Sequence, residues 1–467
     1  MTQIDLLPDD VLLEIFDFNV NMTYDKSLKR VKTDIEAWQP LVHVCRRWRS
    51  LVFGSPRRLD LKLCCIPGTP AKDTLDVWPA LPLILEGDMA LSFSNVIAAL
   101  EQSDRVCEVD LHLTMTGWPG ELERVLALME VPFPKLTDLR LWSYDETPAI
   151  PDSLLGGSAP RLKSFVLVSI SFPGLPKLLL SATHLAQLYL FGIPHSGYIS
   201  PQVIVALLSV LSSLRVLCLE FQSPQSRPDW ESPSLLPPRR SILPALIELR
   251  FKGVAEYLEE LMTRIDTPQL GRMHITFFNQ IDFDCPRLAQ FIDCTPTLKA
   301  PDEAHVEFDD TTVTLRSRTS NLPFEGLLID VSCRESDWQL SSIEQVCNSI
   351  RHPLSTIEDL YIEHRDRELV WNGDGDHAVE NTLWLDLLRP FTAAKNLYLS
   401  KKFVPPMAAA LQELDGDRIT EVLPSLQNIF VEELKPSGPF QKNIGQFVAS
   451  RQLSDHPITI SRWELSS

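Results

Sequence analysis

Apolar residues recur along most of the chain in one short pattern, apolar-x-x-apolar-x-apolar. Clear copies begin at Leu136, Leu162, Leu185, Leu214 and Leu246, with successive separations of 26, 23, 29 and 32 residues. Side chains alternate between the two faces of a β-strand, so the last two apolar positions of each copy share one face. The pattern therefore predicts a series of short strands, each buried on one side.

Weaker copies extend the series in both directions. They begin at Val106, Leu270, Phe324, Ile357, Ala394 and Leu426. Between strands, Ser200 to Ser213 carries helical spacing, and prolines such as Pro134 and Pro160 stand two residues before a strand, where they end the preceding helix. The repeat length is that of a leucine-rich repeat with variable helical segments.

The predicted fold class is α/β, with an irregular leucine-rich-repeat-like solenoid of parallel strands over residues 105–467. Residues 61–104 are predicted to connect this domain to the segment before it. A generic α/β domain is the alternative. The stretch from Phe283 to Arg318 departs from the repeat, with alternating residues at 304–308 and 312–315, and is either an inserted hairpin or one atypical repeat.

The first sixty residues predict two amphipathic helices. Pro8 suits the first position of a helix, and Asp9 and Asp10 complement the positive end of its dipole. Leu12, Ile15 and Phe16 then form one apolar stripe. A second stripe comprises Leu41, Val44, Cys45 and Trp48, with Arg46, Arg47 and Arg49 on the other side. Two such short helices cannot cover both apolar faces, so a partner or the rest of the chain must do so.

These residues resemble the F-box, a short helical module that binds Skp-type adaptor proteins. The resemblance rests on Leu7-Pro8, Leu12 and Ile15-Phe16, followed by Val44-Cys45-Arg46-Arg47-Trp48-Arg49. Residues 17–39 form an insertion longer than the usual connection, and the tryptophan that often follows the second half is absent. The repeats in turn resemble the irregular leucine-rich repeats of many fungal-type F-box proteins.

The resemblance implies an F-box at residues 1–60 and a set of residues that contact a Skp-type adaptor. These are Leu7, Pro8, Leu12, Ile15, Phe16, Leu41, Val44, Cys45 and Trp48. The alternative is that the two helices only cap the following domain.

A partner surface is also predicted on the repeat domain. If the strands stack in parallel, residues that flank the buried leucines face the concave surface. The candidates that bind a target protein are Trp142, Tyr189, Phe191, Arg250, Tyr361 and Tyr398. Aromatic residues and arginine are enriched at interaction hot spots. The alternative is that loops or helices cover these rings.

Composition narrows the class of partner. The net charge of −19 argues against general nucleic-acid binding, because phosphate contacts draw on clustered lysine and arginine. The longest apolar run, Val203 to Leu208, is too short to span a bilayer. Acidic residues near the start and nine dispersed cysteines favour a reduced cytoplasmic or nuclear compartment.

No pattern of catalytic or metal-binding residues stands out. The stretch from Asn372 to Asp376 lacks the glycine and carboxylate of a calcium loop, since His377 and Leu383 hold those positions. His352 and His364 lack a third ligand at metal-site spacing. No cofactor, metal or catalytic residue is predicted, although an enzyme in an irregular α/β domain stays a remote alternative.

Taken with the repeat pattern, the resemblance to the F-box implies a substrate-recognition adaptor of a Skp–cullin–F-box ubiquitin ligase. The helical module would bind the Skp-type protein and, through it, a cullin, while the repeats hold an unknown target protein. The resemblance assigns ubiquitin transfer to other subunits. A non-catalytic scaffold that binds a Skp-type protein outside a cullin complex is the alternative, because it needs the same helices.

Overall fold

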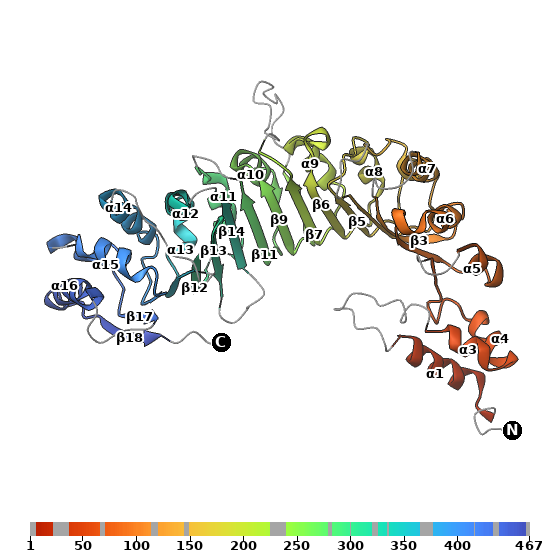
Figure 1. Cartoon of the computed structure of the whole chain (residues 1–467), viewed down its shortest axis with the longest axis horizontal. Coiled ribbons are helices and arrows are strands. Elements are labelled where there is room, and N and C mark those ends of the chain that lie inside the picture. Colours follow the sequence, from red (N-terminus) through yellow and green to blue (C-terminus); the bar gives the residue numbers. More distant parts are fainter. Residues whose placement is uncertain are drawn as a thin grey trace. The chain divides into compact units, whose positions relative to one another are not determined.

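The computed structural model describes most of the chain. The described residues are 6–21, 37–65, 71–113, 120–143, 149–224, 240–278, 283–298, 300–319, 326–333, 336–364, 377–414, 416–432 and 439–463. The chain divides into two compact units, Met1–Gly197 and Tyr198–Ser467. Each unit combines parallel strands with helices (Figure 1).

Within its described residues, unit 1 opens with three helices, which we call the helical module: α1 (Asp9–Asn21), α3 (Gln39–Val44) and α4 (Arg46–Gly54). Six parallel strands follow in chain order in the part of this unit that the structure describes. They are β1 (Leu63–Cys65), β2 (Leu83–Asp88), β3 (Val106–His112), β4 (Asp138–Trp142), β5 (Ser164–Val168) and β6 (Gln187–Ile193). The intervening helices are α5 (Ala71–Val77), α6 (Met89–Leu100), α7 (Glu121–Leu128) and α8 (Leu175–Ser181), with short 3-10 turns at Leu154–Gly157 and His195–Gly197.

The parallel sheet begins at β1, inside the interval 61–104 that the sequence predicted to be a connecting segment. Leu83 and Leu85 of β2 are fully buried, and β2 pairs with β3 in parallel. Ala80-x-x-Leu83-x-Leu85 fits the apolar-x-x-apolar-x-apolar pattern, so the series could have been extended back to β2, whereas β1 before it lacks the pattern.

Unit 2 contains ten strands of one sheet among its described residues, in the order β7-β9-β11-β14-β13-β12-β15-β16-β17-β18. They are β7 (Val216–Phe221), β9 (Glu248–Gly253), β11 (Arg272–Phe277), β12 (Glu303–Phe308), β13 (Thr312–Arg318), β14 (Gly326–Ser332), β15 (Asp359–His364), β16 (Asn396–Leu399), β17 (Asn428–Glu432) and β18 (Thr459–Trp463). Two further short strands, β8 (Ser241–Ile242) and β10 (Ile265–Asp266), pair with each other.

Helices of unit 2 lie on one face of this sheet (Figure 1). They are α9 (Pro201–Leu208), α10 (Ala255–Met262), α11 (Pro286–Cys294), α12 (Ser336–Ser349), α13 (Arg351–Leu354), α14 (His377–Leu388), α15 (Val404–Gln412) and α16 (Pro439–Leu453), with a 3-10 turn at Gly416–Thr420. The strand–helix alternation with parallel strands confirms the predicted solenoid.

Residues along each strand alternate between the core and the opposite side. In β4, Leu139 and Leu141 are fully buried, whereas Arg140 between them is exposed. In β15, Leu360 and Ile362 are fully buried, and Tyr361 is half-buried. We call the side that the intervening residues occupy the open face of each unit's sheet.

One part of unit 2 breaks the repeat, as the sequence indicated for 283–318. Strand β13 runs antiparallel to both β12 and β14, whereas β14 is parallel to β11 and β12 is parallel to β15. Strands β12 and β13 therefore form an inserted hairpin, and β14 pairs with the far edge of β13. The consecutive strands β12, β13 and β14 occur in the sheet in the opposite spatial order.

Trp38 attaches the helical module to the strands of unit 1. Its side chain is fully buried, and its indole N–H donates to the backbone oxygen of Lys62, 3.0 Å away. Its ring packs edge-on against Trp78, with 5.2 Å between centroids, and against Phe53. Trp38 lies at the end of the predicted insertion 17–39, and residues 22–36 of that insertion lie outside the described part of the chain.

We expect Trp38→Ala to lower the melting temperature, because the substitution removes a buried ring and leaves the Lys62 carbonyl without its donor. A loss of about 3–5 kcal/mol of unfolding free energy is typical for such a truncation. Trp38→Phe should retain part of the packing. Trp338, which is 48% exposed, provides the matched control Trp338→Ala. Equal melting temperatures for Trp38→Ala and Trp338→Ala would contradict the role of Trp38.

Candidate partner-binding sites

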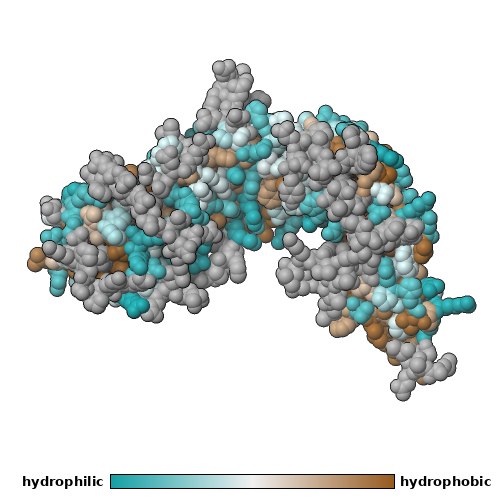
Figure 2. All heavy atoms as spheres, in the orientation of Figure 1, coloured by the Kyte–Doolittle hydropathy of each residue, from teal (hydrophilic) through white to brown (hydrophobic). Residues whose placement is uncertain are grey.

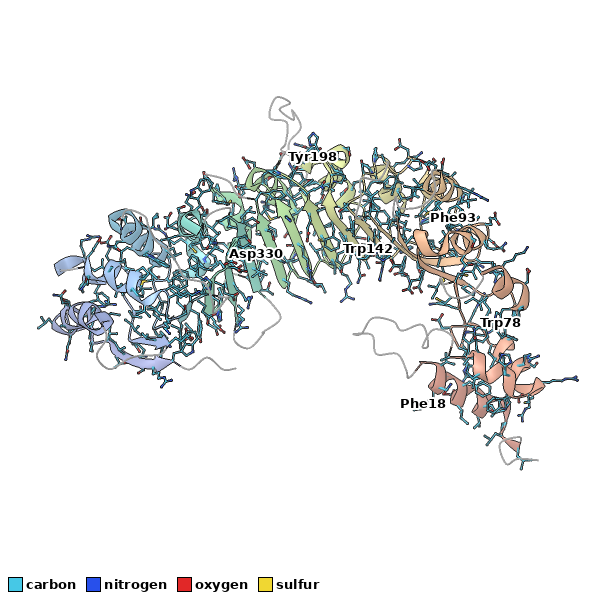
Figure 3. The ribbon with its side chains drawn as sticks, viewed as in Figure 1. Phe18, Trp78, Phe93, Trp142, Tyr198 and Asp330 are labelled. Carbon is cyan, nitrogen blue, oxygen red and sulfur yellow. The ribbon has the colours of Figure 1, made fainter. Side chains whose placement is uncertain are left out.

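The helical module exposes apolar side chains to solvent. On α1, Val11, Ile15 and Phe18 are 38%, 44% and 64% exposed, and their spacing places them on one stripe. Leu6 and Val44 are also exposed. Figure 2 shows the hydrophobic surface of this module in brown, and Figure 3 labels Phe18. We call Leu6, Val11, Ile15, Phe18 and Val44 the apolar surface of the module.

The opposite side of α1 is also apolar and faces inward. Leu12 and Phe16 are fully buried, Val20 is nearly so, and the rings of Phe16 and Trp48 lie 4.7 Å apart. The sequence placed Leu12, Ile15 and Phe16 on a single stripe, but the structure separates Ile15 from the other two. The reason is that α1 carries apolar residues on two sides, one of which fills the module.

The nine residues predicted to contact a Skp-type protein thus fall into two groups. Leu12, Phe16 and Leu41 are buried inside the module. The remaining six have accessible side chains: Leu7 and Trp48 are half-buried, and Pro8, Ile15, Val44 and Cys45 are exposed. Leu6, Val11 and Phe18 were missed, although Val11 and Phe18 follow the same helical spacing as Ile15.

Polar contacts hold the helices of the module in place. Arg47 of α4 binds Asp9 at 2.6 Å and the backbone oxygen of Leu7, so it joins α4 to the start of α1. Arg49 donates to the backbone oxygen of Val42. The Cys45 sulfur accepts a hydrogen bond from the backbone N–H of Trp48 and caps α4. Arginine and cysteine residues of the F-box-like string therefore stabilise the helices that present the apolar surface.

The open face of unit 1 carries paired rings. The Trp142 indole N–H donates to Asp110 at 2.8 Å, and its ring stacks on His112. Trp142 is labelled in Figure 3. Tyr189 and Phe191, two positions apart on β6, stack with centroids 5.6 Å apart. All three predicted residues, Trp142, Tyr189 and Phe191, are half-buried and on the open face. Arg140 forms a longer ion pair with Asp110.

A continuous row of rings crosses the open face of unit 2. His305, Tyr361, Tyr398 and Phe430 stack almost in parallel, with centroid distances of 4.3, 4.1 and 4.6 Å. The in-register pairing of β12, β15, β16 and β17 places these four residues side by side. Trp463 of β18 packs against Tyr361 and Tyr398 at larger angles. We call these five residues the aromatic cluster.

A pocket of about 250 Å³ lies beside this cluster on the same face. Its charged lining comprises Arg250 of β9, Arg272 of β11, Arg316 and Arg318 of β13, and Glu248 of β9, and His274 also borders it. Gly326 at the pocket wall has φ +137°, and a Cβ there would collide with the Ser317 backbone oxygen. We call this site the arginine pocket.

The sequence identified only Arg250 among these arginines. The alternation at 312–315 was visible, and it would have placed Arg316 and Arg318 on one face. The sequence does not show that the reversed hairpin brings β13 within three strands of β9. Arg250 therefore belongs to the pocket rather than to the aromatic cluster.

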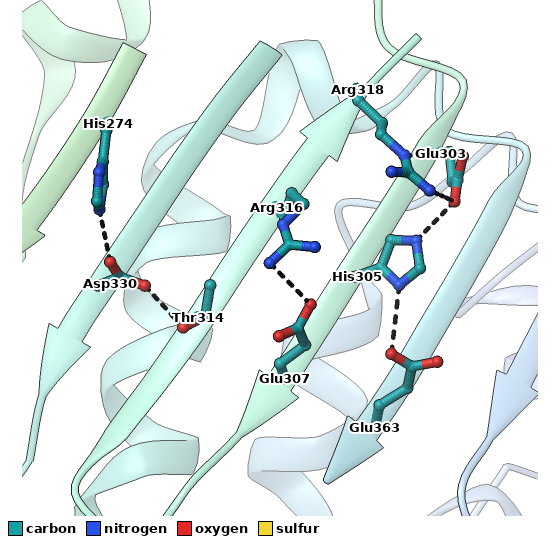
Figure 4. Close-up of polar contacts among 9 residues, drawn as sticks. All are labelled: His274, Glu303, His305, Glu307, Thr314, Arg316, Arg318, Asp330 and Glu363. Atoms are coloured by element: carbon teal, nitrogen blue, oxygen red, sulfur yellow. Dashed lines mark hydrogen bonds and ion pairs between the residues drawn. The ribbon is translucent and has the colours of Figure 1, made fainter. Parts of the chain in front are cut away.

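Carboxylates connect the arginine pocket with the aromatic cluster (Figure 4). Arg318 binds Glu303 at 2.8 Å, and Arg316 binds Glu307 at 3.3 Å. His305 contacts Glu303 through Nε2 at 2.6 Å and Glu363 through Nδ1 at 3.4 Å. On the far side of β13, Asp330 accepts from Thr314 and pairs with His274, each at 2.7 Å.

The pKa values of His305 and Glu303 shift in opposite directions. Burial lowers the pKa of His305, but hydrogen bonds to Glu363 and Glu303, and their charges, outweigh burial and raise it above 6.5. Burial raises the pKa of Glu303, but Arg318 and His305 outweigh burial and lower it below 4.5. Both shifts favour the charged pair.

His305, Glu307 and Glu363 offer ligand atoms within 4.8 Å of one another, a spacing that a divalent cation could bridge. Each already has a protein partner: Glu363 and Glu303 for His305, and Arg316 for Glu307. These ion pairs account for the cluster without a metal. Asn372–Asp376 lie outside the described residues. His352 pairs with Asp293, and His364 contacts Lys402.

We expect His305 to stabilise the fold more at low pH. Because its pKa is raised in the folded state, its contribution is fully present below about pH 6.5 and is lost as pH rises through the folded pKa. The melting-temperature difference between wild type and His305→Gln should be larger at pH 6 than at pH 9. The exposed His456 provides the control His456→Gln. A difference that is equal at both pH values would contradict this assignment.

Helices long and apolar enough to cross a membrane do not occur in the ranges that the structure describes. No protein-family model matches the chain, and no curated protein matches its sequence. Among solved structures, the chain is similar to the leucine-rich repeat-containing protein LegL7 from Legionella pneumophila, at 14% sequence identity and a TM-score of 0.28. The match covers 83% of this chain and 97% of LegL7. A similarity at this TM-score does not support a shared fold. The assignment of a repeat architecture rests on the strand register and burial described above.

Proposed function

We propose that this chain is a substrate-recognition adaptor of a Skp–cullin–F-box ubiquitin ligase. The helical module docks a Skp-type protein, which links it to a cullin, and the repeat domain holds a target protein. The adaptor acts by proximity in the cytoplasm or nucleus, and other subunits transfer ubiquitin. The chain itself makes and breaks no bond.

The observation that carries the proposal is the apolar surface of the module. Val11, Ile15 and Phe18 lie on α1 opposite the buried residues Leu12 and Phe16. Packing within the chain explains the buried stripe of α1. It does not explain why the large apolar side chains of Val11, Ile15 and Phe18 are exposed to solvent. An exposed apolar stripe on a helix is the usual mark of a protein-binding surface. It occurs within the segment whose sequence resembles the F-box.

The open sheet faces support the second half of the proposal. They carry half-buried aromatic residues and arginines, the residue types that dominate interaction hot spots. Buried thiols do not suit catalysis here: burial, with a lesser contribution from Glu108, raises the pKa of Cys107 to about 12. This thiol therefore stays protonated, and unreactive as a nucleophile, at neutral pH.

The test is reconstitution of purified chain with a purified Skp-type protein and a cullin. We expect the wild type to retain both proteins. The double variant Ile15→Glu/Phe18→Glu should reduce retention at least tenfold, because burying two unpaired carboxylates in the interface costs binding free energy. Leu180, which is 55% exposed on α8, supplies the matched control Leu180→Glu. Melting temperatures of all variants verify folding.

Two outcomes would contradict the adaptor. Wild-type chain that retains no Skp-type protein would remove the central claim. Undiminished retention by the double variant would show that the apolar surface is not the docking site. Retention of the Skp-type protein without the cullin would favour a scaffold outside the ligase over an adaptor.

A further inference from the structure

His305, Glu307 and Glu363 form one cluster on the open face of unit 2, where their ligand atoms lie within 4.8 Å of one another. The ion pairs described above account for this cluster in the metal-free chain. We propose that the cluster is also a zinc site, in which Zn²⁺ takes the place of the proton between His305 and Glu363. The proposal goes beyond the adaptor function and does not depend on it.

The contact between His305 and Glu363 has the length of a distance between two metal ligands. Nδ1 of His305 is 3.4 Å from a carboxylate oxygen of Glu363. An N–H···O hydrogen bond is usually about 2.9–3.0 Å long. Two ligands that each lie about 2.0–2.1 Å from a tetrahedral zinc ion are about 3.3–3.4 Å apart. The observed separation is therefore that of two zinc ligands.

Glu303 sets the orientation of the imidazole ring (Figure 4). Its carboxylate contacts the other ring nitrogen of His305, Nε2, at 2.6 Å and is itself held by Arg318 at 2.8 Å. A carboxylate held by arginine accepts a hydrogen bond, so Nε2 carries the hydrogen and Nδ1 is left to bind the metal. A histidine ligand whose second nitrogen donates to a carboxylate is the usual arrangement in zinc sites.

Glu307 supplies the third ligand. It is in register with Glu363 across β12 and β15, and it stands two positions from His305 on the same face of β12. Arg316 binds Oε1 of Glu307 at 3.3 Å, so Oε2 can bind the cation. The side chains of His305, Glu307 and Glu363 are 13%, 12% and 21% exposed. The site is thus partly open to solvent, and a water completes the four ligands.

The charge balance of this region favours a divalent cation. The charged residues on the open face of β12, β13 and β15 are four carboxylates and two guanidinium groups: Glu303, Glu307, Asp359, Glu363, Arg316 and Arg318. With His305 neutral they have an excess of two negative charges, which one divalent cation cancels. An imidazole nitrogen among the ligands disfavours Ca²⁺ and Mg²⁺, which take oxygen ligands, and favours Zn²⁺.

The test measures zinc binding to the purified full-length chain after treatment with a chelator. Competition with a chromophoric zinc chelator at about pH 8 gives the stoichiometry and the affinity, because the imidazole must be deprotonated to bind the metal. We expect one zinc ion per chain. His305→Gln and Glu363→Gln should each weaken binding by about 100-fold or more, since each removes a ligand.

Two further variants separate the loss of a ligand from a general effect of charge. Glu303→Gln should weaken zinc binding by about tenfold, because this carboxylate orients the imidazole without touching the metal. Glu123→Gln removes one exposed carboxylate from α7 and should bind zinc like the wild type. Melting temperatures identify any variant that fails to fold, and the other ligand variant then provides the test.

The absorption spectrum of the Co²⁺-loaded chain gives an independent readout of the ligand type. Nitrogen and oxygen ligands should give the visible bands of four-coordinate cobalt without the near-ultraviolet band that thiolate ligands produce. A thiolate band would assign the metal to cysteines and overturn the proposal. Wild type that binds no zinc, or ligand variants that bind like Glu123→Gln, would also overturn it. Because no Skp-type protein or cullin is present, this failure is distinguishable from failure of the reconstitution.

Discussion

In-register pairing of parallel strands is the constraint on which the rest of the structure depends. Each strand alternates between core and open face, so a shift of one residue would expose the leucines and bury the intervening polar residues. Leu139 pairs with Phe165, and Leu360 pairs with Leu397, so the core positions align from strand to strand. The same register aligns the residues between them. The stacked row of His305, Tyr361, Tyr398 and Phe430 is therefore a by-product of core packing.

The reversed strand β13 gives one region of unit 2 a different chemistry. Regular repeats bring together residues at equal positions of successive strands. The hairpin instead sets Arg316 opposite Leu328 and brings Arg318 to Glu303. This arrangement collects charged groups that a uniform solenoid would distribute along the chain. The charged groups are also linked by shared ion pairs, because Glu303 contacts both Arg318 and His305.

In the helical module, helix α1 has two apolar sides, one buried inside the module and one exposed to solvent. Phe16 fills its interior and packs against Trp48, and Trp38 secures the module to the first strands of unit 1. Arg47 joins the two ends of the F-box-like string through Asp9 and the Leu7 carbonyl. These contacts hold α1 so that Ile15 and Phe18 face solvent. Adaptor docking on this surface stays a proposal.

Local patterns in the sequence were enough to predict the solenoid, the first N-terminal helix and the open-face positions of Trp142, Tyr189, Phe191, Tyr361 and Tyr398. The second predicted N-terminal helix is instead two helices, α3 and α4, because the backbone of Cys45 between them is extended. Periodicity is a local property, and it specifies which side of a strand or helix each residue occupies. Only the tertiary structure decided which stripe of α1 is buried, that strands begin at Leu63, and that Arg250 lines the same pocket as Arg316 and Arg318. Those outcomes depend on contacts between segments far apart in the chain and on the direction of β13. A one-dimensional pattern does not encode the order and direction in which strands pair.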